Sequence, residues 1–233
     1  MNLESILMQS RIRLDDLGTT GVLWTDEDLI AYANAGEREI CRRALVLKDA
    51  TSAITTVSLV SGTSTYVIDP RIILVNRAAL DGAGRLKRIS VEVLDTILGW
   101  EAASGTPSYF SRDYSDGMLL VTPTPNADAD LKLTVYRMPL SSMSSAQDIP
   151  EIPEELHSYI IDWVCYEAYS KNDADTQNLE KANYFFEKFS RSIGAARPAD
   201  IFAVIQREFP KYLDTAASQG STGDRVYAPR DSK

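Results

Sequence analysis

The sequence predicts a mainly α-helical protein in which a β-rich insertion separates two helical segments. Apolar residues recur every three or four positions in residues 1–50 and 151–213, which is the spacing of one helical face. In residues 51–150, β-branched residues alternate with polar ones between Gly- and Pro-containing turns, as in short strands. We therefore expect an antiparallel helical bundle core, a small antiparallel sheet or barrel, and an extended C-terminal arm formed by residues 214–233.

The N-terminal segment is predicted to form two helices. Apolar side chains of residues 2–17 share one helical face, and Gly18 is a typical stop. A second helix should begin after Thr25, whose hydroxyl can cap it, and Asp28 three residues later gives a pattern like a capping box. Trp24, just before the cap, is placed to pack on the first turn.

The central segment is predicted to form short strands. They are expected at residues 51–60, 65–68, 72–79, 84–93, 118–121 and 131–137. Residues 91–98 alternatively form one helical turn. Pro107, Pro123 and Pro125 confine their segments to sheet edges or turns.

The strongest helical pattern lies in residues 150–193, which we expect to form a helical hairpin at the centre of the core. Pro153 suits a first helical position, because its missing N–H would be unpaired there anyway. The polar link NDAD separates the two helices, and so short a link favours an antiparallel pair. Residues 201–213 are predicted to form one more short helix. The apolar faces of the hairpin consist of Leu156, Ile160, Trp163, Val164 and Ala168, and of Leu179, Ala182, Phe185, Phe186, Phe189 and Ile193.

The composition argues against several classes of function. The net charge is −9 and no basic stripe is present, so tight binding of nucleic acid is not expected. Cys41 and Cys165 lie in apolar helical patterns, where buried free thiols are expected rather than a disulfide. Because neither a secretory signal nor a membrane-spanning segment is recognisable, we expect a soluble protein made in a cytoplasm.

No catalytic, cofactor or metal site is predicted. His157 is the single histidine, which rules out His–His metal spacing, and its place at a helix start favours a surface or groove position. Phosphate-binding and dinucleotide-binding glycine motifs are lacking, as is a Cys-x-x-Cys pair. The carboxylates are numerous enough to include a glycosidase-type pair, but nothing in the sequence singles one out.

Two stretches resemble a known family. LWTDEDLIAYANAGEREICRR and IPEELHSYIIDWVCYEAYSKNDADTQNLEKANYFFEKF are similar to the first core helix and the helical hairpin of head-to-tail adaptor proteins of short-tailed bacteriophages, also called connectors or tail accessory factors. Together they cover about sixty of the 233 residues. They lie at the two ends of the fold with a variable β region between them, which is the family's arrangement.

The resemblance implies a structural protein of the virion, without catalytic residues, cofactor or metal. The family's adaptors form a ring of twelve copies beneath the portal, assembled in the host cytoplasm. Such a ring joins the portal to the tail nozzle and continues the DNA channel for genome ejection, without sequence-specific DNA binding or a membrane. Two other functions stay open: a cell-wall-degrading enzyme of the glycosidase type, and a module whose β region binds a glycan or a fibre protein.

The polar segment 214–233 contains too little apolar surface to fold alone. We expect it to be disordered in the free protein and extended along a neighbouring subunit or the portal. Tyr227 is its predicted main anchor, because a tyrosine buries a large area and keeps a hydrogen bond through its hydroxyl. The complete set of expected interface residues is Arg225, Val226, Tyr227, Pro229 and Arg230.

Overall fold

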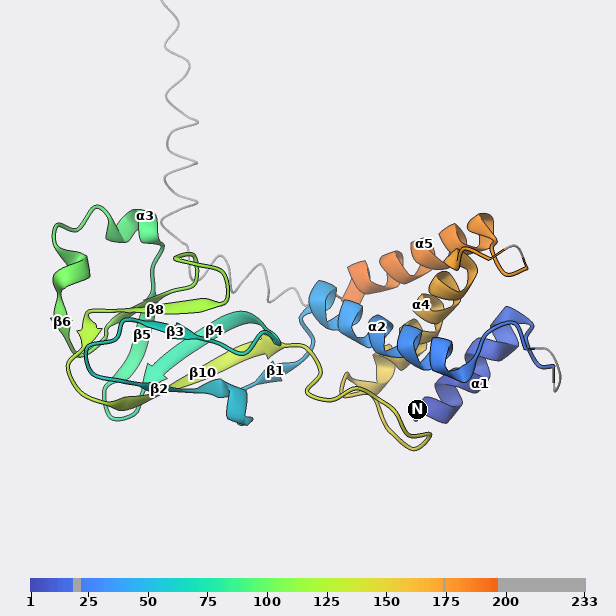
Figure 1. Ribbon diagram of the computed structural model, residues 1–233, viewed down its shortest axis with the longest axis horizontal. Coiled ribbons are helices and arrows are strands. Elements are labelled where there is room, and N and C mark those ends of the chain that lie inside the picture. The colour runs from blue at the N-terminus through green and yellow to red at the C-terminus, as the bar shows by residue number, and fades with distance from the viewer. Residues whose placement is uncertain (19–21, 174, 197–233) are drawn as a thin grey trace, which may run out of the picture. The chain divides into compact units, whose positions relative to one another are not determined.

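The computed structural model describes residues 1–18, 22–173 and 175–196 (Figure 1). The α-helices in this part of the chain are α1 (Leu3–Leu14), α2 (Asp26–Ala44), α3 (Val91–Leu94), α4 (His157–Ser170) and α5 (Leu179–Ala196). Short 3₁₀ turns occur at η1 (Ala53–Thr55), η2 (Trp100–Ala102) and η3 (Glu154–Leu156). The strands are β1 (Lys48–Asp49), β2 (Thr56–Leu59), β3 (Thr65–Val67), β4 (Ile72–Leu80), β5 (Gly84–Arg88), β6 (Ser104–Gly105), β7 (Tyr109–Ser111), β8 (Met118–Thr122), β9 (Thr124–Pro125) and β10 (Ala129–Arg137).

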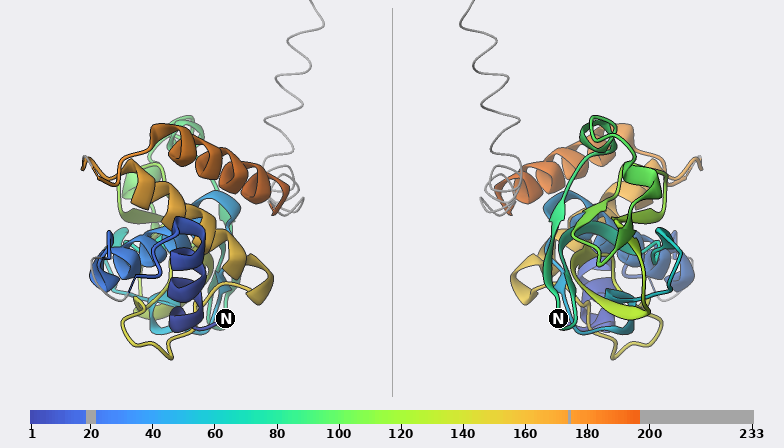
Figure 2. Two further views of the ribbon diagram at one scale, coloured as in Figure 1. Left: turned by 90° about the vertical axis from the view of Figure 1, so that its right-hand side faces the viewer. Right: turned by 90° about the vertical axis from the view of Figure 1, so that its left-hand side faces the viewer.

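Eight of these strands form one curled sheet, which the right-hand view of Figure 2 shows end-on. The strand order is β1-β10-β4-β5-β7-β8-β3, and β2 also pairs with β10. The nine-residue strands β4 and β10 run antiparallel at its centre, with Leu131 opposite Leu80 and Arg137 opposite Ile72. Only the β5–β7 pairing in this sheet is parallel. The dipeptide strands β6 and β9 form a separate parallel pair.

The prediction of a mainly α-helical protein with a helical bundle core and a small β region is wrong. The fold is a mixed α/β one, in which a large curled sheet stands beside the helices. The alternation pattern underestimated this sheet, because β1 and β7 are only two and three residues long, and β1 is formed by pairing with the distant strand β10. The strands at β2, β3, β4, β5, β8 and β10 lie within or close to the predicted runs, and residues 91–94 adopt the alternative helical turn.

Two apolar clusters form the interior. One lies among the helices and includes Ile40, Val164 and Phe189, each fully buried. The other lies inside the curled sheet and includes Val75 and Phe110. This second cluster forms because each strand places alternate side chains on one face of the sheet, and the curl of the sheet turns that face inward.

The helices are fixed by caps and by a buried carboxylate. The Thr25 hydroxyl accepts the N–H of Asp28, as predicted for the start of α2. The first helix ends at Leu14 rather than near Gly18. Asp162 on α4 is almost fully buried and pairs with Arg13 of α1 and with Lys188 of α5. One carboxylate therefore connects three helices, which a burial pattern alone does not reveal.

Helices α4 and α5 lie side by side (Figure 2), as expected of the helical hairpin, and aromatic side chains pack one against the other. Trp163 contacts Phe189, with ring centroids 4.9 Å apart, and Tyr166 contacts Phe186 at 5.1 Å. Trp24 packs edge-on against Tyr169 of α4 instead of stapling the first turn of its own helix, and its indole N–H donates to the Ala168 carbonyl at 2.9 Å.

Pro153 stands one position earlier than predicted, as the N-cap of η3, and α4 begins only at His157.

A close helix–helix approach at Gly36 of α2 predicts opposite effects for one substitution at two glycines. A Cβ at position 36 would lie 3.1 Å from the Cβ and Cδ1 atoms of Trp163, whose ring is held by Phe189. We expect Gly36→Ala to lower the free energy of unfolding by about 1 kcal/mol, because the overpacking exceeds the gain in helix propensity. Gly194→Ala on α5 meets open space and should raise it by about 0.5 kcal/mol. Urea unfolding of both variants measures the two shifts, and stabilisation by Gly36→Ala would contradict the close packing.

Candidate assembly interface

A buried ion-pair network centred on Arg137 joins the sheet to the chain that follows it. The Nε atom of Arg137, on β10, donates to Asp49 Oδ2 of β1 at 2.6 Å, and its Nη1 atom donates to Glu151 Oε2 at 2.6 Å. The Arg137 and Asp49 side chains are 13% and 7% exposed. Burial opposes ionisation of Asp49, but the N–H groups of Thr51 and Ser52 and the guanidinium outweigh it, so the pKa of Asp49 is far below its usual value.

The connector between β10 and α4 is anchored to α2 through the same network. Glu151 Oε1 accepts the N–H of Leu140 at 2.6 Å, and the N–H of Glu151 donates to Glu37 Oε1 at 2.6 Å. Further along, the side-chain amide of Asn34 makes two hydrogen bonds to the backbone of Met143. Burial raises the pKa of Glu37, against the lowering effect of the N–H groups of Glu151 and Ile152. The connector is therefore a fixed part of the structure rather than a loose polar linker.

Glu37 and Glu151 are neighbouring acidic residues, which raises the question of a catalytic carboxylate pair. The cavity beside Glu37 and Asn34 measures about 30 Å³, which is the volume of one water molecule and far below that of a sugar ring. Both carboxylates are also occupied by backbone donors or by Arg137. In the described parts of the chain, no group of three His, Cys, Asp or Glu side chains could hold a metal ion. These contacts support a structural role for the pair.

His157 is buried, which corrects the expectation of a surface or groove histidine. Its Nε2 atom lies 2.9 Å from the Ile152 carbonyl and its Nδ1 atom lies 2.9 Å from the Met1 ammonium. Because an ammonium can only donate, Nδ1 accepts and Nε2–H donates. Both ring nitrogens therefore hold the start of α4 against its neighbours.

Cys41 and Cys165 are free, buried thiols, as predicted. Burial raises the pKa of each thiol to about 12. Neither is a nucleophile or an oxidation site under ordinary conditions, because reactivity requires the thiolate.

Helix α1 carries apolar side chains on two opposite sides. Leu3, Ile6 and Leu14 face the interior, whereas Met8 and Ile12, four residues apart on one outer face, are 63% and 53% exposed. Leu17, Val22 and Leu23 extend the exposed set beyond the helix. We call these five exposed side chains the α1 surface. Exposed apolar side chains of this size are candidates for a protein–protein contact.

A second exposed apolar group lies on the segment that contains α3. Val93, Ile97 and Leu98 are exposed within six residues, and Leu98 is fully exposed. Residues 89–111 contain three acidic side chains and no Lys or Arg. We call this segment the α3 loop. Its composition suits contact with a partner that is apolar and basic.

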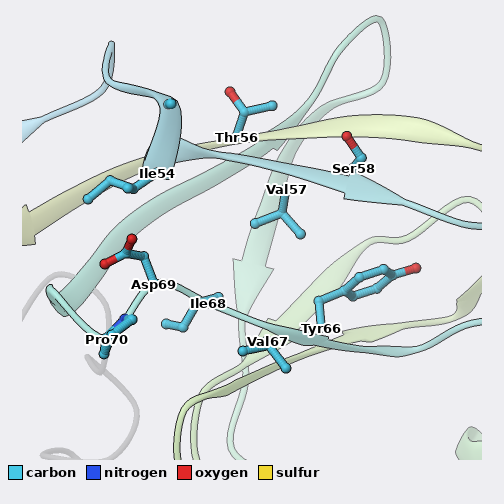
Figure 3. Close-up of a pocket in the computed structure, with 10 residues that line it drawn as sticks. Ile54, Thr56, Val57, Ser58, Tyr66, Val67, Ile68, Asp69 and Pro70 are labelled. Carbon is cyan, nitrogen blue, oxygen red and sulfur yellow. The ribbon is translucent and has the colours of Figure 1, made fainter.

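A groove of about 560 Å³ lies between β2 and β3 (Figure 3). In this view Val57 points from β2 toward β3, and Tyr66 rises from β3 toward β2. Both side chains pack against the apolar cluster of the curled sheet. The two strands are consecutive in the chain but do not pair with each other, so the sheet is open here.

The residues predicted to form the interface lie outside the described part of the chain. Arg225, Val226, Tyr227, Pro229 and Arg230 all belong to residues 197–233, as does the short helix predicted at 201–213. Their role stays a prediction. The sequence did not predict the α1 surface, the α3 loop or the groove. The runs that contain Val67 and Leu98 carry more apolar residues than one buried face needs, and these extra residues were the available signal of an exposed apolar surface.

One protein family matches nearly the whole chain. Its sequence model, described as SU10 adaptor protein, matches residues 1–209. The chain belongs to the SU10 adaptor protein family. No curated protein matches the sequence. The resemblance seen in the two helical stretches is thereby confirmed and extends across the β region between them.

Membership makes the protein a structural adaptor of a bacteriophage virion, at the junction of head and tail and in association with portal and tail components. Membership in an adaptor family points to a structural role. Over the described residues, helices long and apolar enough to cross a membrane are absent. The exposed apolar surfaces described above are the features through which an adaptor can contact other proteins.

Proposed function

We propose that the protein forms a ring of twelve copies that joins the portal to the tail nozzle and continues the DNA channel. The observation that carries the proposal is the family match over residues 1–209. A closed ring needs two different complementary surfaces on each copy, so that the same contact repeats from one subunit to the next. The α1 surface and the α3 loop are two exposed apolar groups of different composition, which supports this arrangement.

The charge of the chain is compatible with a channel through which DNA slides. At a net charge of −9, the protein lacks the basic excess that binds phosphates and would retain DNA. We propose that DNA passes through the ring without sequence-specific contacts. Assembly of the ring takes place in the host cytoplasm, and residues 51–150 extend from its side or lower face.

The C-terminal arm is the proposed contact with the portal or a neighbouring subunit. Its apolar anchors Val226, Tyr227 and Pro229 stand between Arg225 and Arg230, which can pair with carboxylates. A segment that orders only on binding can cover a long surface, at the cost of the entropy lost on ordering. An arm that has apolar anchors between two arginines, and that orders only on binding, suits attachment to a portal already present in the capsid.

Mass photometry of the full-length protein mixed with the portal protein of the same phage tests the ring. Twelve copies of 25.8 kDa should add about 310 kDa to the portal particle. The protein alone serves as the control, and a monomer there is compatible with assembly on the portal. An unchanged portal mass at saturating protein would contradict the proposal.

A further inference from the structure

The groove between β2 and β3 is bordered by a strand edge whose backbone is left unpaired. The Ser64 carbonyl accepts the N–H of Val121 at 2.8 Å, and the N–H of Ile68 donates to the Gly117 carbonyl at 3.0 Å. In an antiparallel strand, the backbone N–H and C=O groups of every second residue point to the same neighbouring strand. The backbone groups of Thr65 and Val67 therefore point away from β8, and within the described chain β3 pairs with β8 alone.

This edge lacks the usual protection against pairing with another chain. Natural edge strands carry charges, proline or a bulge, but β3 reads Thr-Tyr-Val and pairs with β8 in regular register. Val67 is 77% exposed. The edge of β2, on the other side of the groove, is less available for pairing with another strand. The N–H of Thr56 there already donates to the Ala53 carbonyl. An extended peptide added to β3 would satisfy these groups and cover the apolar groove.

We propose that the C-terminal arm of a second copy adds a strand to β3, with residues 225–228 in the groove. The inference rests on the proposed ring, in which each copy donates its arm to the next. The 28 residues between 196 and 225 span about 95 Å when extended, which is ample for a neighbouring subunit. Charge favours the same pairing, because exposed Asp128 borders the hairpin end of the groove and arginines flank the arm's apolar run.

The segment 225–228 fits this edge in length and in pattern. Val226 and Tyr227 favour extended backbone, and Pro229 ends the strand because it has no N–H to donate. Three or four residues match the three-residue edge of β3. With Arg225 and Tyr227 directed toward the groove, where Tyr227 can be buried as the main anchor, the side chains of Val226 and Ala228 lie on the outer face, on the same side as Val67.

Disulfide trapping in the full-length chain tests the strand. A chain carrying Val67→Cys is mixed with a size-tagged chain carrying Cys in place of one of residues 225–228 in turn. Mild oxidation and a non-reducing gel then report the cross-link. The native thiols Cys41 and Cys165 are buried, with pKa values raised to about 12, and stay silent.

We expect alternating yields, about tenfold higher from positions 226 and 228 than from 225 and 227, because a disulfide requires closely spaced Cβ atoms. Thr65→Pro in the Val67→Cys chain should abolish the cross-link by removing an edge N–H, whereas Thr65→Ala should retain it. A chain with Tyr184→Cys, on α5 and 62% exposed, provides the background. Yields at that background, or equal yields from all four positions, overturn the proposal. Ring formation on the portal is measured independently, so either proposal can fail without the other.

Discussion

Replacing Arg137 by methionine is expected to lower the free energy of unfolding by about 4 kcal/mol. The substitution keeps most of the apolar stem but leaves Asp49, 7% exposed, and Glu151 without their shared cation. Removing one partner from a buried ion pair is costly because the remaining charge stays desolvated. Urea unfolding followed by circular dichroism at neutral pH measures the loss.

A double-mutant cycle separates the ion pair from the loss of packing. Asp49→Asn removes one uncompensated charge, so the double variant with Arg137→Met should be more stable than the sum of the single effects, by about 2 kcal/mol. Gln in place of exposed Glu101 is a control for a carboxylate far from the network and should change stability by less than about 0.5 kcal/mol. Additive single effects would show that Arg137 acts through packing alone.

The loss of stability at low pH gives a second measurement of the ion pair between Asp49 and Arg137. Because the pKa of Asp49 is lowered on folding, its contribution is present above the unfolded value of about 3.9 and is lost as the pH falls. The wild-type chain should lose stability more steeply below pH 4 than Asp49→Asn does. Glu37 has the opposite sign, since burial raises its pKa and favours the folded state in acid. Comparing the two proteins at each pH cancels that contribution.

The helices could be predicted from sequence because their information is local. Thr25 caps α2 through the N–H three residues ahead, and the aromatic stripes of α4 and α5 follow the helical period. The extent of the sheet could not be predicted in this way. Strand β1 consists of Lys48 and Asp49 and exists because β10 pairs with it 86 or more residues later. No local pattern specifies such a pairing.

The candidate interface could also be predicted only where its information is local. The family was recognisable from two helical stretches, but its surfaces depend on tertiary structure. Met8 and Ile12 belong to a helix with apolar residues on more than one side, and only packing shows which of those sides faces outward. Val67 alternates correctly with buried Ile68, yet its strand becomes an edge only because β2 pairs with β10 rather than with β3. The buried Arg137 network needs three segments to meet and has no sequence signature.

Truncation after Ala217 is expected to abolish ring assembly on the portal while leaving the folded part of the chain intact. The removed residues contain few apolar side chains, so their loss should change the thermal midpoint by less than about 2 °C. The same residues carry every proposed anchor of the arm. Without them each copy would have to bind the portal through its remaining surfaces alone. Portal pull-down, with circular dichroism as the folding control, measures both halves of the expectation.

Tyr227→Ala gives a graded form of the same experiment in the full-length chain. If this side chain is the main anchor, the substitution should weaken portal assembly by about 2 kcal/mol, or roughly thirtyfold in the concentration needed. Ser218→Ala, earlier in the same arm and small, is the matched control and should have no effect. A truncated chain that assembles as well as the intact protein would show that the arm plays no part in attachment. Attachment would then depend on the α1 surface or the α3 loop, whose exposed side chains Met8 and Leu98 are the next positions to substitute.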